Sequence, residues 1–122
     1  MKTAVILLAH GTREPDASGP VYRYAEALAH ESGLPVEPGF REFIEPSLPT
    51  VMRKIVERGA RRVFVVPFFL FKSGHVTRDI EQDVSAERAK FPDVHVLIAE
   101  PLGFDPAVVG VLHERLREVL SR

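Results

Sequence analysis

The residues of this chain best suited to chemistry are two histidines that each follow an apolar run. His10 comes directly after residues 3–9 (TAVILLA), and His75 comes shortly after residues 62–71 (RVFVVPFFLF). Imidazole binds first-row divalent metals and exchanges a proton near neutral pH. Either histidine alone would be interpreted as an ordinary loop residue. Two in equivalent places, each beside a glycine that lets the backbone approach a ligand, favour one shared site.

The apolar runs before the two histidines are typical of strands that are buried on both faces, as in a parallel sheet. Ligands of such sheets bind just beyond the carboxyl ends of the strands, which is where both histidines lie. Strands and helices alternate along the whole chain. Strands are predicted over 3–9, 36–43, 63–70 and 94–99, and helices over 17–31, 48–58, 76–91 and 107–120.

Capping signals and apolar faces support this division. Ser47 is the expected N-cap of the second helix, and Asp105 followed by Pro106 is a well-formed start for the last one. The apolar faces of the first two helices are Val21, Ala25, Leu28 and Ala29, and Leu48, Val51, Met52, Ile55 and Val56. In the third helix, the residues expected to face solvent are Asp79, Glu81, Asp83, Glu87, Arg88 and Lys90.

Strand–helix units repeated four times predict an α/β fold with helices on both faces of a four-stranded parallel sheet. We expect this three-layer, flavodoxin-like sheet to have the strand order 2-1-3-4, because Pro38 and Gly39 suit the second strand to an edge. The winding then reverses between strands one and three, and a crevice opens between their carboxyl ends. His10 and His75 follow these two strands, and Glu42 ends the second strand. With neighbouring strands about 4.8 Å apart, all three side chains can point into one pocket.

The composition is that of an ordinary globular protein. The 122 residues suit a single domain, residues 1–122, with 45% hydrophobic and 27% charged residues. With 16 Lys and Arg against 17 Asp and Glu, we expect neither nucleic acid nor a membrane surface as a partner. The first apolar run is short for a signal peptide and no stretch is long enough to span a membrane, so we expect a cytoplasmic protein. The chain has no cysteine, so any metal must be bound by His, Asp or Glu.

Two imidazoles and a carboxylate are a workable ligand set for a divalent metal. Imidazole suits Fe, Co, Ni and Zn, and a carboxylate neutralises part of the charge. No compact motif such as HExxH supports this set, which depends on the predicted topology. A nucleophilic triad is less favoured, because neither Thr12 nor Ser73 lies in a G-x-S-x-G elbow. The segment 11–13 also lacks the glycine spacing of phosphate-binding loops.

Cations and apolar residues accompany the histidines in the sequence. One basic loop residue is usually solvated, but four beside one predicted crevice favour an anionic ligand. Leu70 and Phe71 can form the floor under a flat apolar ligand, whereas Phe69 is expected in the core. The four cations are Arg13, Arg41, Lys72 and Arg78. The remaining histidines, interpreted as structural or solvated, are His30, His95 and His113.

Several longer segments carry a resemblance to a known family. They are residues 7–13 (LLAHGTR), 40–48 (FREFIEPSL), 59–63 (GARRV), 66–80 (VPFFLFKSGHVTRDI) and 101–103 (PLG). In this order, and over nearly the whole chain, they resemble the CbiX/SirB class of sirohydrochlorin chelatases. Ala9 and Thr12 depart from the family pattern, which usually has Gly and Ser at these places.

The resemblance implies roles for the candidate residues. His10 and His75 would be the catalytic pair that binds the metal and assists its insertion, and Glu42 would help to bind it. The substrate would be sirohydrochlorin, a flat tetrapyrrole with peripheral carboxylates. No cofactor is implied beyond the substrate metal ion, which is Co²⁺ in first place and otherwise Fe²⁺ or Ni²⁺. The substrate-binding residues would be Arg13, Arg41, Leu70, Phe71, Lys72, Ser73, Gly74 and Arg78.

The resemblance also implies an assembly. Many relatives carry two such units in one chain, so this chain resembles one half of a bilobal chelatase. Short members of the family pair as homodimers and place the macrocycle in the cleft between two copies. The expected contact is the apolar surface of Leu70, Phe71 and the last helix (Val108, Val109, Leu112 and Leu116), although packing within one chain would also account for part of it.

The expected function is therefore insertion of Co²⁺ into sirohydrochlorin, in cobalamin or sirohaem biosynthesis. Insertion of Fe²⁺ or Ni²⁺ is an alternative of the same class, because His/Glu sites follow the Irving–Williams order and not biological need. An alternative of a different class is a non-catalytic carrier of metal or tetrapyrrole, which would show no turnover.

Overall fold

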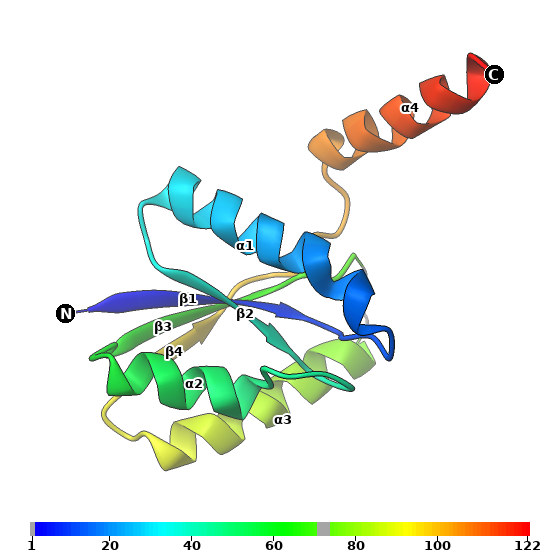
Figure 1. The fold of residues 1–122 in the computed structure, drawn as a ribbon. Helices are drawn as coiled ribbons and strands as arrows, with labels where there is room; N and C mark the ends of the chain where they lie inside the picture. The colour runs from blue at the N-terminus through cyan, green and yellow to red at the C-terminus, as the bar shows by residue number, and fades with distance from the viewer. Residues whose placement is uncertain (1, 71–73) are drawn as a thin grey trace.

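The computed structural model describes residues 2–70 and 74–122 and shows strands and helices in alternation (Figure 1). The expectations for Phe71, Lys72 and Ser73 lie outside the described residues. Within the described ranges, the strands are β1 (Thr3–Ala9), β2 (Val36–Phe40), β3 (Arg62–Pro67) and β4 (His95–Ile98). The helices are the 3-10 helix η1 (Pro15–Ser18), α1 (Gly19–Ser32), α2 (Leu48–Glu57), α3 (Gly74–Lys90) and α4 (Pro106–Leu120).

The described strands form one parallel sheet in the order β2-β1-β3-β4, which confirms the predicted fold class and strand order. β1 lies between β2 and β3 and pairs with both, and all its apolar residues are buried. Leu8 lies opposite Gly39 on one side and opposite Pro67 on the other, so these strands end at the same edge. The segments that follow β1, β2 and β3 therefore start side by side.

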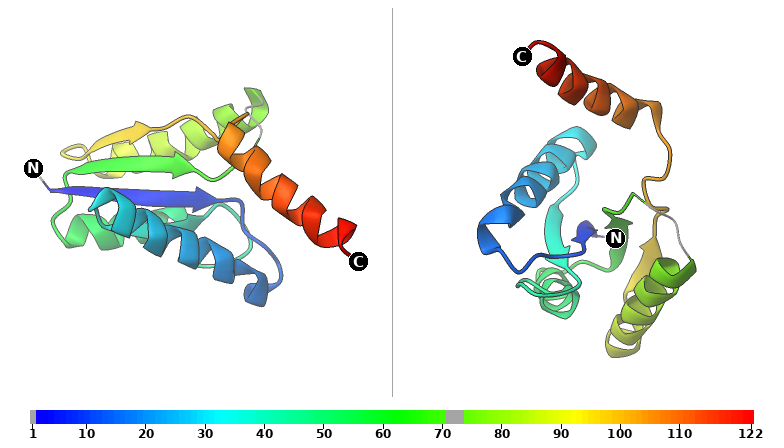
Figure 2. Two further views of the ribbon diagram at one scale, coloured as in Figure 1. Left: turned by 90° about the horizontal axis from the view of Figure 1, so that it is seen from above. Right: turned by 90° about the vertical axis from the view of Figure 1, so that its right-hand side faces the viewer.

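Helices cover the two faces of the sheet unequally. α2 and α3 lie together on one face, and α1 lies on the other face over β1 and β2 (Figures 1 and 2). The larger core lies between the sheet and the α2–α3 layer, where Ile6, Leu8, Met52 and Val63 are buried. In α1, whose backbone is described throughout, only Ala25 is buried. One face of the sheet is therefore thickly covered and the other only in part.

Helix starts follow the predicted capping signals. The Ser47 hydroxyl oxygen accepts a hydrogen bond from the Thr50 N–H at 3.4 Å. The Asp105 carboxylate accepts one from the Ala107 N–H at 2.9 Å, so both predicted N-caps are confirmed. α1 begins at Gly19, slightly later than predicted, because η1 occupies the preceding turn.

Two strands end well before their predicted ends, and β4 (His95–Ile98) is shorter than predicted at both ends. β2 ends at Phe40 and not at Phe43, because Phe40 lies opposite Ala9, the last residue of its partner β1. β3 ends at Pro67, before its predicted end. Phe68 donates one further hydrogen bond, to the Leu8 carbonyl at 2.7 Å, and β1 itself ends shortly after. Both early ends lengthen the loops at the carboxyl edge of the sheet.

One charged residue of α3 has the opposite exposure to that predicted. Glu87 is expected to face solvent but is only 2% exposed, because it shares the inner face of α3 with Ile80 and Val84. Lys90 Nζ lies 2.9 Å from Glu87 Oε2 and balances the charge. Among the described residues, Glu87 Oε1 has no hydrogen-bond partner. The prediction for Glu87 is wrong because helical spacing, and not residue type, decides which side chains face the core.

The last helix lies apart from the rest of the molecule. α4 projects beyond the carboxyl edge of the sheet at the end of the connection 99–105 (Figures 1 and 2). It packs against none of the other described helices and strands. Its side chains are exposed, apart from Val108, which is half-buried. Like the other described helices, α4 is too short or too polar to cross a bilayer.

Candidate functional site

The carboxyl edge of the sheet brings His10 and Glu42 together. The Arg41 N–H donates to the Ala9 carbonyl at 2.9 Å. The Glu42 N–H donates to the His10 carbonyl, also at 2.9 Å, so the pairing of β1 with β2 continues past the ends of both strands. His10 Nε2 then lies 3.5 Å from Glu42 Oε2, with both side chains about half exposed. This imidazole–carboxylate pair can take up a ligand from solvent and exchange protons with it.

Gly11 is the residue that allows these two loops to meet. Its φ is +110°, a conformation that residues with a Cβ rarely adopt. A Cβ built on Gly11 would overlap the carbonyl oxygen of Glu42. The sequence predicts that this glycine lets the backbone approach a ligand. In the structure, the group that lies close to Gly11 is the backbone of the neighbouring loop at Glu42.

Two aromatic rings frame His10. Phe43 and Phe69 stand edge-on to the imidazole, at centroid distances of 6.1 and 6.3 Å. Phe69, which is expected in the core, is partly buried against it. The Arg13 guanidinium carbon lies 4.3 Å from the centroid of the Phe43 ring, in a cation–π contact. The His10 imidazole therefore lies among aromatic side chains, and the Arg13 guanidinium places a positive charge beside one of these rings.

Sequence reasoning misses Phe43 as a candidate site residue. It is half exposed and holds a left-handed φ of 76°. Backbone strain of this kind in a residue with a side chain clusters at ligand sites. Phe43 is expected at the end of a strand, where nothing distinguishes it from other apolar residues. The one signal that could have identified Phe43 is its position in the segment 40–48, which carries part of the family resemblance.

His75 lies in the first turn of α3, with its side chain 82% exposed. Its Nε2 is 3.6 Å from Asp79 Oδ2, one helical turn further on. Among the residues that the structure describes, no group of three or more His, Asp or Glu side chains is placed to hold a metal ion. The structure pairs His10 with Glu42 and His75 with Asp79. The joint ligand set of His10, Glu42 and His75 stays a prediction.

The predicted substrate-binding residues have different surroundings. Arg41 donates from Nε to Asp83 Oδ2 at 2.8 Å, and its side chain is only 15% exposed. It ties the segment after β2 to α3, and its low exposure makes it less accessible to an anion than the exposed arginines. The predicted residues that are open to solvent are Arg13, Leu70, Gly74 and Arg78.

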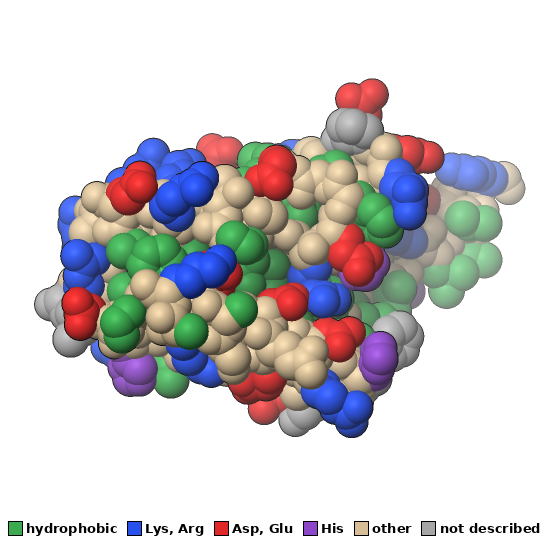
Figure 3. All heavy atoms as spheres, turned by 90° about the horizontal axis from the view of Figure 1, so that it is seen from below, with side chains coloured by type: hydrophobic (Ala, Val, Ile, Leu, Met, Phe, Trp, Pro, Cys, Tyr) green, Lys and Arg blue, Asp and Glu red, His purple; other side chains and the backbone are tan. Residues whose placement is uncertain are grey.

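Below Arg41, on the α2–α3 side, lies a cavity of about 430 Å³. Arg41 and Lys90 line it together with the carboxylates of Glu42, Asp83 and Glu87. Acidic and basic side chains are interspersed over this whole face of the molecule (Figure 3). Because carboxylates outnumber cations in its lining, this cavity is poorly suited to a strongly anionic ligand.

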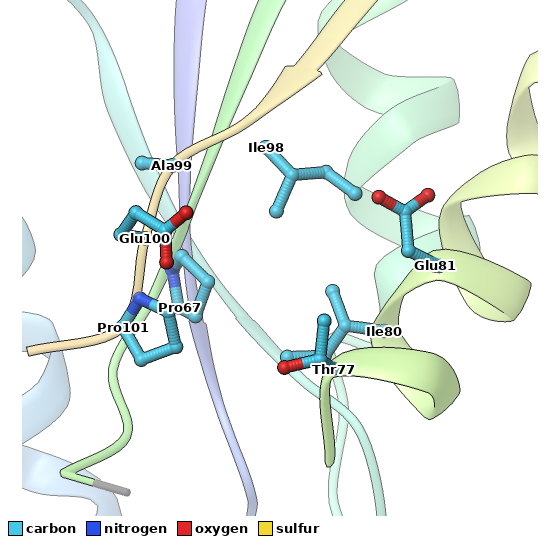
Figure 4. Close-up of a pocket in the computed structure, with 8 residues that line it drawn as sticks. All are labelled: Pro67, Thr77, Ile80, Glu81, Ile98, Ala99, Glu100 and Pro101. Carbon is cyan, nitrogen blue, oxygen red and sulfur yellow. The ribbon is translucent and has the colours of Figure 1, made fainter. Parts of the chain in front are cut away.

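A smaller cavity of about 100 Å³ lies at the carboxyl ends of β3 and β4. Thr77 and Glu81 of α3 face Glu100 and Pro101 across it, and Ile98 lies at one end (Figure 4). Ligand pockets in proteins measure roughly 300–1,000 Å³. This cavity is therefore too small for a large ligand.

The turn after β2 is closed by Glu45. Its Oε1 accepts hydrogen bonds from the Ser47 N–H and the Thr50 hydroxyl, both at 2.9 Å. These bonds, that of the Ser47 backbone first, lower the pKa of the Glu45 carboxyl below its usual value. The carboxylate thereby fastens the start of α2 to the segment that carries Glu42.

Sequence comparison relates the chain to known proteins. The model of the protein family described as CbiX matches residues 4–119. The sirohydrochlorin cobaltochelatase of Sulfolobus acidocaldarius is 36% identical over 117 residues, which are 96% of this chain and 92% of that protein. The sirohydrochlorin ferrochelatase of Bacillus subtilis is 28% identical over 98% of this chain and 46% of its own length. The chain thus spans nearly all of the Sulfolobus protein and about half of the Bacillus one.

Solved structures share the fold along nearly the whole chain. A cobalamin (vitamin B12) biosynthesis CbiX protein from Marinobacter aquaeolei superposes with a TM-score of 0.82 and 27% identity, covering 98% of both chains. The sirohydrochlorin chelatase SirB from Bacillus subtilis subspecies spizizenii, in complex with cobalt, superposes with a TM-score of 0.90 and 26% identity. It covers 98% of this chain and 51% of that one. The matched length leaves out only a few residues, so it includes α4.

Proposed function

Because the chain belongs to the CbiX family, we propose that it inserts a divalent metal ion, Co²⁺ in first place, into sirohydrochlorin. The observation that carries this proposal is the solvent-open pair of His10 Nε2 and Glu42 Oε2, 3.5 Å apart at the carboxyl edge of the sheet. Relatives of about this length are named cobaltochelatases. Relatives named ferrochelatases are about twice as long. This difference in length favours cobalt over iron.

Metal insertion needs an open-sided metal site and acceptors for two protons. In this proposal, His10 and His75 present the metal ion and Glu42 neutralises part of its charge. The ring nitrogens lose two protons as they bind the divalent ion, so the net charge of the ring together with its metal is unchanged. An imidazole that releases the metal accepts one of these protons and passes it to water, and water accepts the other proton directly. No cofactor beyond the substrate metal is part of the proposal.

The surroundings of His10 suit a flat ring with a charged rim. Phe43, Phe69 and the exposed Leu70 offer apolar surface beside the imidazole. Arg13, held over the Phe43 ring, and the exposed Arg78 offer positive charge to the peripheral carboxylates. One chain supplies these groups from one side, so we also propose a homodimer as the working unit, with the macrocycle between two copies.

The test is metal insertion by the purified chain, followed by the absorbance change of sirohydrochlorin. Co²⁺, Fe²⁺ and Ni²⁺ are supplied separately without oxygen, and the uncatalysed rate is subtracted. We expect turnover with Co²⁺ and a loss of about a hundredfold in kcat/KM for His10→Ala and for His75→Ala. His95→Ala is the matched control, because this exposed histidine lies at the opposite, amino-terminal end of β4.

Each other outcome has a defined meaning. Fastest turnover with Fe²⁺ or Ni²⁺ would assign that metal in place of cobalt. Binding of Co²⁺ without turnover of any metal would identify a carrier and contradict the proposed activity. Unchanged rates in both the His10→Ala and His75→Ala variants would exclude these histidines as the catalytic pair.

A further inference from the structure

The three candidate metal ligands belong to two parts of the molecule. His10 and Glu42 lie on loops that backbone hydrogen bonds join to each other. His75 lies in the first turn of α3. Among the described helices and strands, α3 lies against α2 and β4 and against neither β1 nor β2. Binding of one metal ion by all three side chains therefore depends on how α3 is held relative to the loops that follow β1 and β2.

The bond between Arg41 and Asp83 joins these two parts directly. Arg41 precedes Glu42, and its N–H donates to the carbonyl of Ala9 at 2.9 Å, next to His10. Its side chain reaches α3, where Nε lies 2.8 Å from Asp83 Oδ2. Because the Arg41 side chain is only 15% exposed, water competes little for this charge-assisted bond. The bond therefore holds the segment of Glu42 against α3.

Asp83 lies on the side of α3 that carries His75. Asp79 lies midway between them, and side chains four residues apart are neighbours on one side of a helix. The two turns from His75 to Asp83 span about 12 Å along the helix axis. α3 is continuous over this length, from Gly74 to Lys90. A constraint on the position of Asp83 is therefore also a constraint on the position of His75.

We propose that Arg41 and Asp83 are positioning residues for metal binding, and that their bond limits how far His75 can lie from the pair of His10 and Glu42. The proposal rests on the proposed function, because it takes these two residues and His75 as joint ligands of the substrate metal. Neither positioning residue contacts the metal ion or sirohydrochlorin in this role. A ligand whose range of positions is limited in advance loses less freedom when the metal binds, so the bond strengthens metal binding.

The charge of Arg41 separates this role from the alternatives. A cation beside a metal site repels the metal ion, so loss of the guanidinium would strengthen metal binding if charge alone mattered. An arginine that only recognised the carboxylates of sirohydrochlorin would not be needed to bind the metal alone. Positioning predicts weaker metal binding both for Arg41→Gln and for Asp83→Asn. The direction of the change in the Arg41 variant therefore decides between these roles.

The experiment is a titration of the purified full chain with Co²⁺ alone, followed by calorimetry and by the d–d absorption of the bound ion. We expect the dissociation constant of Co²⁺ to rise about tenfold for Arg41→Gln and for Asp83→Asn. The double variant should bind Co²⁺ no more weakly than either single variant, because both substitutions remove the same bond. Circular dichroism of each variant checks that it is folded.

Two control variants match the two substitutions. Asp79→Asn removes the same charge as Asp83→Asn, one turn nearer to His75, but its ion pair lies within α3, so we expect less than about a twofold change. This comparison also keeps the test decisive if Arg41→Gln does not fold, because charge alone predicts the larger loss at the nearer aspartate. Lys54→Gln removes a cation that joins α2 to β2, and it should leave Co²⁺ binding unchanged.

The positioning role and the proposed function can fail separately. Unchanged or tighter Co²⁺ binding by Arg41→Gln, or equal effects of Asp79→Asn and Asp83→Asn, would overturn the positioning role. A double variant in which the two losses multiply would overturn it as well. If His10→Ala and His75→Ala weaken Co²⁺ binding while the Arg41 variant does not, the proposed function stands without the positioning role. If both histidine variants bind Co²⁺ as the wild type does, the joint ligand set is wrong and the positioning role is wrong with it.

Discussion

The two imidazole–carboxylate pairs of this protein are built in opposite ways. His10 and Glu42 lie on different loops, which are joined by backbone hydrogen bonds and accompanied by two aromatic rings. His75 and Asp79 lie one turn apart on a single helix, and this imidazole is largely exposed. Exposed pairs of the second kind contribute little to stability. One half of the candidate site is therefore organised by long-range contacts, and the other half only by local ones.

The largest contrast is expected when each glycine beside a candidate histidine is replaced by alanine. Gly11→Ala should lower the free energy of unfolding by about 2 kcal/mol or more, because of its φ of +110° and the overlap of a Cβ with the Glu42 carbonyl. Gly74→Ala meets open space and should change it by no more than about 0.5 kcal/mol. Urea denaturation measures both. Equal effects of the two substitutions would remove the distinction between the two halves.

Acidification should slow metal insertion without unfolding the segments that carry the two imidazole–carboxylate pairs. A step that needs a neutral imidazole should slow as the pH falls through the range in which histidine side chains are protonated. The measurement is kcat/KM for metal insertion against pH, with circular dichroism at each pH as the control for folding. A rate that stays constant through this range would argue against imidazole as metal ligand and proton acceptor.

The carboxylate partners of the two histidines should differ in importance. Glu42→Gln keeps the size of the side chain and removes the charge beside His10, so we expect kcat/KM to fall about fivefold. Asp79→Asn removes an exposed pair within one helix, and we expect less than a twofold change. Steady-state insertion kinetics of both variants provide the comparison. Full activity of Glu42→Gln would leave Glu42 as no more than an ion-pair partner of His10.

The smallest effect concerns the turn that carries Glu42. The pKa of Glu45 is lowered in the folded state, so its carboxylate contributes stability above its unfolded value of about 4.5. That contribution is lost as the pH falls through the lowered, folded value. Glu45→Gln should therefore melt slightly below wild type at pH 7, and the gap should close in acid. A gap of equal size at every pH would assign the effect to packing and not to charge.

Much of the fold could be predicted because the determining signals are local. Apolar runs mark β1 and β3, and single residues such as Ser47 and Asp105 mark the starts of helices. The strand order follows from these elements by general rules of handedness and edge position. The proximity of His10 and Glu42 follows in turn from the strand order, and the structure bears it out.

The features that escaped prediction depend on geometry that residue type does not encode. The side-chain partner of Arg41 is Asp83 on α3, which is far along the chain, so no local sequence pattern predicts this hydrogen bond. The left-handed Phe43 follows from how the chain leaves β2. The spacing of His75 and Asp79, in contrast, is the ordinary spacing of neighbours on a helix, and a helical projection of residues 76–91 extended by one turn would have paired them.

The central position of β1 has a consequence for how the chain folds as it is made. β1 is synthesised before the other described strands, yet its partner on one side, β3, is complete only after Pro67. Parallel pairing between segments so distant in sequence is slow, because a long loop must close before the contacts form. Until then, a nearly all-apolar strand has an open hydrogen-bonding edge, which invites association with other nascent chains. A nascent chain that exposes β1 but not yet β3 is therefore in its most aggregation-prone form, and holdase chaperones should bind it there.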